Sequence, residues 1–325
     1  MSSPTGEGNS PTPGPASSTP QTEGLLPGAH WGHRQLPDNN TDSTLGSDVE
    51  SSTASISSSI LKYRTIEGRT YHSDSVTDGE YWAPNDDKAN EMLDIFHHLA
   101  NLLFDGELYT APITDEPKNA IDIGTGTGLW AIDFADKFPE CNVISTDISP
   151  IQPSWLSGAA KDWPETYRQA YRYCKPGGWI EHIDTSTVCY SDDGSVNEKH
   201  AMAQWSKVWQ EAARLTGYPV DLIEKNRMEE GMKAAGFTNI VSKDYPIPLS
   251  PWPKDPKQKE RGLFFHALWA PDLEGYVQHT FGNVMGWTKE EMKIYIQHLR
   301  AELRNPDLHG QIIFRSVYAQ KPLDA

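Results

Sequence analysis

The stretch that decides the fold is residues 122–130, DIGTGTGLW, in which three glycines occupy alternate positions directly after a short apolar run. The flanking patterns predict a strand over 120–123, a helix over 128–138 and a second strand over 142–147. Strand, glycine turn, helix and strand form a βαβ unit, which requires a parallel pair with a right-handed crossover. The sequence therefore predicts an α/β domain that binds its ligand at the carboxyl ends of its strands.

The glycine turn and two acidic residues indicate a nucleotide-type ligand. Such turns bring the backbone close to a ligand, and an acidic residue at the end of the next strand hydrogen-bonds ribose hydroxyls. The dinucleotide fingerprint needs a third glycine three positions after the second, whereas these glycines alternate. The spacing suits a ligand without a pyrophosphate and favours S-adenosyl-L-methionine over NAD. The predicted cofactor-binding residues are Asp122, Gly124, Thr125, Gly126, Gly128 and Asp147.

Composition narrows the classes of function. A formal charge of −17 and a pI near 5.0 disfavour direct contact with nucleic acid or an anionic membrane. No run of about 18 apolar residues is present, so no membrane span is predicted. Three widely spaced cysteines form no CxxC pair, which indicates a reducing, intracellular compartment, cytoplasm or nucleus, and predicts neither disulfides nor a zinc site.

The first 60 residues differ from the remainder of the chain. Residues 1–60 are rich in serine, threonine, proline and glycine, and Arg34 is their one basic side chain apart from histidine. Such a stretch buries too little apolar surface to offset its ordering entropy, so we expect a disordered tail. Periodic patterns begin at Leu61, and 61–325 is the expected folded domain.

Helical and strand patterns alternate over that domain. Helices are predicted over 86–104, 161–174, 198–216 and 221–236, with a helix-rich stretch over 256–304. Further strands are predicted over 179–190, 237–247 and 310–322.

Three motifs resemble a known family. They are RTYHSDSVTDGEYWAPND at 69–86, the run from APITDEP to PSW at 111–155, and KDWPETYRQAYRYCKPGGWIEHID at 161–184. They resemble the fungal LaeA-like class I S-adenosylmethionine-dependent methyltransferases, associated with the regulation or tailoring of secondary metabolism. The resemblance implies a Rossmann-like, mostly parallel sheet flanked by helices, and a small-molecule or protein methyl acceptor. It also implies that the glycines lie along the methionine end of the cofactor, that Asp147 takes the ribose, and that Pro84–Asp86 help close a lid.

The chain departs from this family pattern after residue 155. In the family, SPIQPSW is followed by a third strand, which ends in acidic residues near the adenine, and by a fourth strand. Here only LSGAA separates Trp155 from Lys161, so a few tens of residues and one or two strands are missing. Because the fourth strand normally lies mid-sheet, we expect 179–184 either to pair directly with 120–124 or to leave a vacancy. The missing adenine contacts are replaced from elsewhere, or the cofactor is held poorly, or the gene model is mis-spliced.

The sequence assigns no catalytic residue. Methyl transfer from a sulfonium depends mainly on positioning, so no dedicated base is required. His182 and His266 are candidates for a base, although lone histidines are more often core groups. His97 and His98 are adjacent rather than four apart, so no metal site is expected. The aromatic residues that are candidates for an acceptor pocket, or more simply for core, are Phe264, Phe265, Trp269 and Tyr276.

Three functions follow from these observations. The first is S-adenosylmethionine-dependent methyl transfer in fungal secondary metabolism. The second is a non-catalytic protein that keeps the fold's surfaces and serves as an interaction or regulatory partner, which the missing stretch favours. The third is a nicotinamide-dependent oxidoreductase, which the glycine spacing disfavours.

Overall fold

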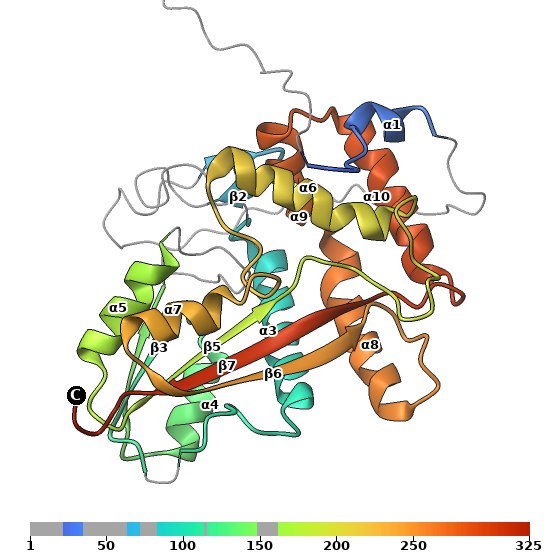
Figure 1. Ribbon diagram of the computed structural model, residues 1–325. Helices are drawn as coiled ribbons and strands as arrows, with labels where there is room; N and C mark the ends of the chain where they lie inside the picture. The colour runs from blue at the N-terminus through green and yellow to red at the C-terminus, as the bar shows by residue number, and fades with distance from the viewer. Residues whose placement is uncertain (1–21, 35–63, 72–82, 114–115, 148–161) are drawn as a thin grey trace, which may run out of the picture.

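A computed structural model describes residues 22–34, 64–71, 83–113, 116–147 and 162–325 (Figure 1). The remainder of the predicted tail lies outside the described residues, as do the SPIQPSW motif and the LSGAA segment that follows it. In the part that is described, α-helices flank three small sheets, and no helix there is long and apolar enough to cross a membrane.

The predicted βαβ unit is present. β3 (Asn119–Ile123) pairs in parallel with β4 (Asn142–Thr146), and Ile121 lies opposite Ile144. α4 (Leu129–Lys137) forms the connection and packs one face of the pair through buried Ala131 and Phe134. The prediction from DIGTGTGLW is therefore confirmed at the level of secondary structure and topology.

A separate three-stranded sheet follows in the second half of the chain. β7 (Gln311–Gln320) lies between β5 (Trp179–Thr185) and β6 (Thr238–Pro248) and is antiparallel to both. Side chains alternate along β7, so Phe314 faces one side of the sheet and Val317 the other. The α/β class is confirmed. The sheet is less parallel than expected, because the missing strands are those that would have paired in parallel in the centre.

Helices cover both faces of this sheet. Those on the Val317 face are α5 (Trp163–Tyr173) and α7 (Arg227–Ala235), and those on the Phe314 face are α3 (Asp87–Leu103) and α8 (Pro256–Trp269) (Figure 1). Phe96 of α3 packs on Phe314 with ring centroids 5.5 Å apart. Tyr167 of α5 and Met232 of α7 are fully buried on the opposite face.

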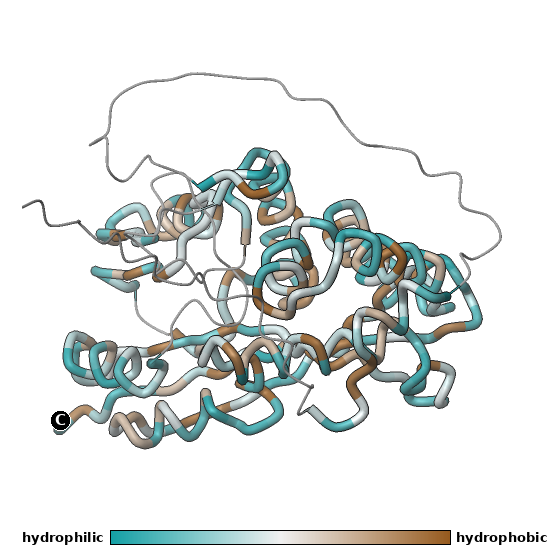
Figure 2. Tube along the Cα trace, turned by 90° about the horizontal axis from the view of Figure 1, so that it is seen from above, coloured by the Kyte–Doolittle hydropathy of each residue, from teal (hydrophilic) through white to brown (hydrophobic). Residues whose placement is uncertain are grey.

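The remaining helices gather at one end of the sheet (Figure 1). They are α6 (Ala201–Thr216), the 3₁₀-helix η1 (Ala270–Asp272), α9 (Leu273–Val277), the π-helix η2 (Gln278–Val284) and α10 (Lys289–Arg304). Their shared core contains Trp205, Phe281 and Tyr295. Hydrophobic and hydrophilic positions alternate along the outer helices, as expected for amphipathic segments (Figure 2). The antiparallel hairpin of β1 (Arg64–Ile66) and β2 (Arg69–Tyr71) lies beside this group.

An N-terminal segment, residues 22–34, belongs to the folded structure. It contains α1 (Gly28–Gly32), whose Trp31 is fully buried and packs edge-on against Tyr295 of α10 at 5.0 Å. The Leu26 amide donates a hydrogen bond to Gln204 Oε1 at 2.9 Å. The expectation of one disordered tail over 1–60 is therefore wrong for residues 22–34. Their few apolar side chains are clustered, and the average composition of the tail conceals that clustering.

Of the two outcomes expected for the shortened sheet, the structure has the vacancy. Among the described residues, β3 pairs only with β4, and β5 pairs only with β7. No helix in the described part of the chain covers the face of the β3–β4 pair opposite α4, and Ile121, Ile123 and Ile144 are 58%, 67% and 49% exposed. The missing stretch thus leaves apolar sheet surface in contact with solvent.

We predict that Trp31→Ala destabilises the protein by about 3–5 kcal/mol, because it empties a fully buried indole site. The measurement is the free energy of unfolding of the full chain in urea. Tyr173→Ala, at a residue that is 72% exposed, is the control and should have little effect. Equal effects of the two substitutions would show that residues 22–34 do not pack on the domain.

A second prediction concerns pH. Glu302 of α10 accepts the backbone amides of Ala201 and Met202 at 2.7 and 2.8 Å, and burial raises the pKa of its carboxyl to about 7. The folded state therefore binds a proton more tightly than the unfolded state, whose carboxyl has the ordinary value of 4.5. Its contribution to stability is full below pH 4.5 and is lost as the pH rises through 7.

The expected result is that the stability of the native chain relative to Glu302→Gln falls by about 2–3 kcal/mol between pH 5 and 8. Urea unfolding at a series of pH values measures it, with the exposed Glu290→Gln as the matched control. A constant difference between Glu302→Gln and the native chain across this range would contradict the assignment.

Candidate functional site

The glycine turn between β3 and α4 is shaped by three left-handed residues. Gly124, Gly126 and Gly128 have φ angles of 78°, 59° and 83°, a region that disfavours any residue with a Cβ. The amides of Gly124 and Thr125 donate to the carbonyl of Thr146 at 2.8 and 3.1 Å, which fastens the turn to the end of β4. Gly128 is the N-cap of α4.

The two acidic residues predicted for this site lie against the turn. Asp147, just past β4, accepts the Gly126 amide through Oδ2 at 3.1 Å. Asp122 is buried on β3 and accepts the Thr125 hydroxyl at 2.6 Å. The structure thus brings all six predicted residues together in one hydrogen-bonded turn. Their role in binding a cofactor remains a prediction.

The electrostatics of the turn favour a cationic ligand. Burial raises the pKa of Asp122, and the nearby Asp147 charge raises it further, while the Thr125 hydroxyl and His97 oppose the shift. Two neighbouring carboxylates are stabilised by a positive charge placed beside them. S-adenosylmethionine carries positive charge on its sulfonium and its amino group, so the Asp122 and Asp147 carboxylates fit it.

α3 passes beside this turn. His97 Nε2 lies 2.8 Å from Asp133 Oδ2 of α4, while the adjacent His98 ring contacts Phe264 instead. The two histidines therefore point to different neighbours, as expected for consecutive helix residues. Across the described residues, no group of three or more metal-type ligands is found.

The two histidines considered as catalytic bases are packed against other side chains of the fold. His182 of β5 accepts or shares a hydrogen bond with the Tyr167 hydroxyl at 2.6 Å and stacks on Trp163, and burial lowers its pKa to about 4. It is a neutral core group on the α5 face of the sheet. His266 of α8 does not line the cavity described next, and burial lowers its pKa as well.

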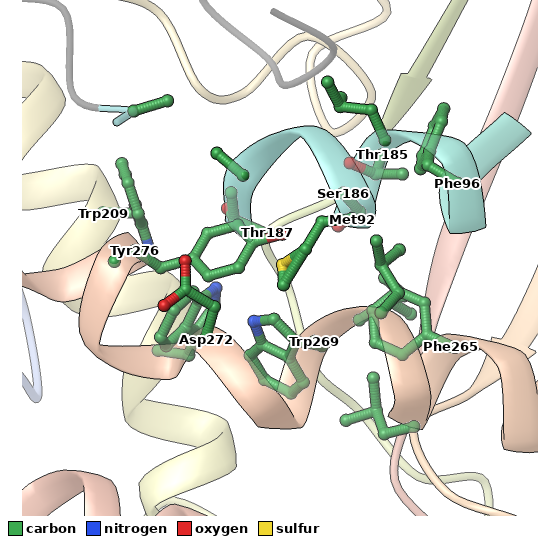
Figure 3. Close-up of a pocket in the computed structure, with 18 of the residues that line it drawn as sticks. Met92, Phe96, Thr185, Ser186, Thr187, Trp209, Phe265, Trp269, Asp272 and Tyr276 are labelled. Atoms are coloured by element: carbon green, nitrogen blue, oxygen red, sulfur yellow. The ribbon is translucent and has the colours of Figure 1, made fainter. Parts of the chain in front are cut away.

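A cavity of about 120 Å³ lies between α3, the segment after β5, α6 and the α8–α9 region (Figure 3). Phe265, Trp269 and Tyr276 line it, as the acceptor-pocket hypothesis requires, but Phe264 does not. The prediction from sequence missed the lining residues that come from other elements, which include Met92, Phe96, Thr185, Ser186, Thr187, Trp205 and Trp209. The signal in the sequence for this wall of the cavity was the pair Trp205 and Trp209 on α6, although core packing explains that pair equally well.

The Pro84–Asp86 motif lies at the start of α3. Pro84 lines the cavity, and Asp86 caps α3 by accepting the Ala89 amide at 3.1 Å. Asp86 also binds Arg69 of β2, which in turn binds Asp272. The motif therefore joins the hairpin, α3 and η1 beside the cavity. Its action as a lid remains a prediction.

Known proteins match the chain over most of its length. The methyltransferase pytC of Aspergillus terreus is 33% identical over 305 residues, which cover 85% of this chain and 93% of that protein. The chain belongs to this family of fungal methyltransferases. The secondary metabolism regulator laeA of Aspergillus fumigatus is 31% identical over 291 residues, covering 79% and 76%. The expectation of a LaeA-like methyltransferase family is confirmed.

Other comparisons add little to this assignment. No protein-family model matches the chain. Among solved structures, a phosphoethanolamine N-methyltransferase of Haemonchus contortus aligns with a TM-score of 0.36 and 15% identity, covering 77% of this chain and 56% of that one. The family assignment does not rest on that likeness.

The family match also bears on the expected missing stretch. The alignment with pytC extends over 305 positions, whereas 85% of this 325-residue chain is about 276 residues. The relative therefore has about 29 positions without a counterpart here. This total, taken over the whole alignment, has the size expected for the stretch absent between Trp155 and Lys161.

We predict that Gly128→Ala costs about 1–2 kcal/mol of stability through its left-handed backbone alone, because an added Cβ would contact no other atom. Gly128→Asn should cost less, since asparagine tolerates this region. Urea unfolding of the two variants provides the comparison. If alanine were as stable as glycine, the turn would not have the conformation described here.

Proposed function

We propose that the chain holds S-adenosylmethionine in the glycine turn and transfers its methyl group to an acceptor of fungal secondary metabolism. The observation that carries this proposal is the Asp147 carboxylate, which lies at the carboxyl end of a parallel strand pair and accepts the Gly126 amide. This geometry supports Asp147 as the ribose partner, because its carboxylate lies against the turn itself. In this proposal a carboxylate oxygen of Asp147 accepts a hydrogen bond from a ribose hydroxyl.

Each residue of the turn has a role in this proposal. The three glycines allow the backbone to lie against the methionine end of the cofactor. Asp122, supported by Thr125, supplies negative charge below it. When bound, the cofactor supplies a methyl carbon, which the acceptor's lone pair attacks as the carbon–sulfur bond breaks and its electron pair returns to sulfur. The chain contributes position and charge, and the described cavity has no histidine in its lining.

A specific observation favours the second candidate function, a regulatory or interaction partner. The vacancy between β3 and β5 leaves two strand edges unpaired among the described residues, beside an apolar sheet face. Unpaired edges and exposed isoleucines are features of interaction surfaces. Under this proposal the chain keeps the methyltransferase surfaces but binds cofactor weakly. Cofactor binding separates the two functions.

We also propose that the protein acts inside the cell, in the cytoplasm or the nucleus. All three cysteines, Cys141, Cys174 and Cys189, are free thiols. Burial raises the pKa of each thiol, so all three remain protonated and unreactive at neutral pH. Free thiols are the expected state in a reducing compartment.

The test is calorimetric titration of the full chain with S-adenosylmethionine and S-adenosylhomocysteine. Asp147→Ala should weaken binding by about 1–3 kcal/mol, as expected for the loss of a charged hydrogen-bond acceptor. Asp136→Ala, at an exposed position on α4, should leave binding unchanged. An unaltered dissociation constant in Asp147→Ala would remove Asp147 from the site. No binding by the folded native chain would favour the partner function instead.

A further inference from the structure

The aromatic cavity specifies a class of methyl acceptor, an inference that rests on the proposed methyl transfer. The cavity follows the carboxyl end of β5 and is bounded by α3, which also reaches α4 through His97 (Figure 3). α3 therefore contacts both the cavity and α4, the helix that follows the glycine turn.

The walls of the cavity are aromatic rings in edge and tilted contact. Trp205 lies edge-on to Trp269 with centroids 4.8 Å apart, and its ring lies 5.8 Å from that of Trp209. Tyr276 is 6.3 Å from Trp205, and Phe265 is 5.7 Å from Trp269. Such walls present both ring faces and ring edges, which favours a further aromatic ring in an offset or edge-to-face arrangement.

The lining residues that the structure describes carry no free charge. Its one carboxylate, Asp272, binds Arg69 at 2.7 Å and Lys88 at 3.0 Å, so it is neutralised from outside the cavity. Burial raises the pKa of the Cys189 thiol, which is therefore neutral. The Asp86 and Asp272 carboxylates balance the Arg69 guanidinium and the Lys88 ammonium, so this cluster adds no net charge that would attract a cation to the cavity. The site therefore favours an uncharged ligand.

A hydroxyl group in the lining is available to orient a ligand. Among the described residues, the Thr187 hydroxyl has no hydrogen-bond partner, whereas the Ser186 hydroxyl binds Glu224 and the Val188 amide. Thr187 follows β5 and lies at the cavity wall (Figure 3). It can donate to or accept from a hydroxyl or amine on a bound ring.

We propose that this cavity binds one uncharged aromatic ring of a small-molecule methyl acceptor, with Thr187 contacting its polar substituent. The volume of about 120 Å³ supports this size, since an apolar cavity of about 150 Å³ in another protein holds benzene. A larger acceptor would place only one ring here. A charged peptide side chain is a poor match for the same lining.

The probe is phenol, titrated into the full chain by calorimetry and by ligand-observed NMR, without cofactor. Millimolar or tighter binding is expected, and tetramethylammonium should neither bind nor displace phenol. Ala89→Leu fills the cavity from α3 and should weaken phenol binding at least tenfold, while Glu91→Leu, exposed on the same helix, should not. Thr187→Val should weaken it a few-fold.

Several outcomes would overturn the inference: no phenol binding by the folded chain, unchanged affinity in both Ala89→Leu and Thr187→Val, or displacement of phenol by tetramethylammonium. Because phenol is measured without cofactor, its failure is distinct from failure of the proposed function. Phenol binding without S-adenosylhomocysteine binding would leave the cavity assigned and refute the methyl transfer. Binding of S-adenosylhomocysteine without binding of phenol would retain methyl transfer and refute the aromatic acceptor.

Discussion

The structure depends on a partly buried carboxylate that joins two sheets with no strand pairing between them among the described residues. Glu181 of β5 accepts the amides of Thr110 and Ala111, which lie in the connection that leads from α3 to β3. On the other side, Trp130 of α4 donates to the carbonyl of Leu108 in the same connection at 2.7 Å. Burial raises the pKa of Glu181, and these hydrogen bonds oppose the rise. Side-chain hydrogen bonds thus connect the two sheets, as a central strand does in a complete sheet.

This arrangement explains how the glycine turn is formed although the stretch after Trp155 is absent. The hydrogen bonds named above join the turn to β3, β4 and α4. The residues predicted to contact the ribose and the methionine end of a cofactor are therefore held together without the absent strands. The acidic adenine contacts expected after a third strand have no counterpart among the described residues. The shortened chain leaves the apolar β3–β4 face exposed.

Local spacing was enough to predict the turn, because residues 122–147 form a contiguous βαβ unit. The sequence allowed two outcomes for the sheet, direct pairing of 179–184 with 120–124 or a vacancy. It could not distinguish them, because strand pairing between residues far apart in the chain determines the result. Trp205 and Trp209 reach the cavity through the packing of α6 on α8 and α9, far away in sequence. Trp31 was missed because the apolar cluster around it is short and surrounded by polar residues, while its burial depends on α10.

The measurement that tests the central claim most directly is amide hydrogen exchange of the full chain with and without S-adenosylhomocysteine. The account predicts that the ligand slows exchange chiefly in residues 122–128 and 146–147, where the turn meets the end of β4. The amides of Thr110 and Ala111 should be protected in both states, because Glu181 binds them without the ligand. A cooperatively folded chain whose glycine turn exchanges equally fast in saturating ligand would contradict the account.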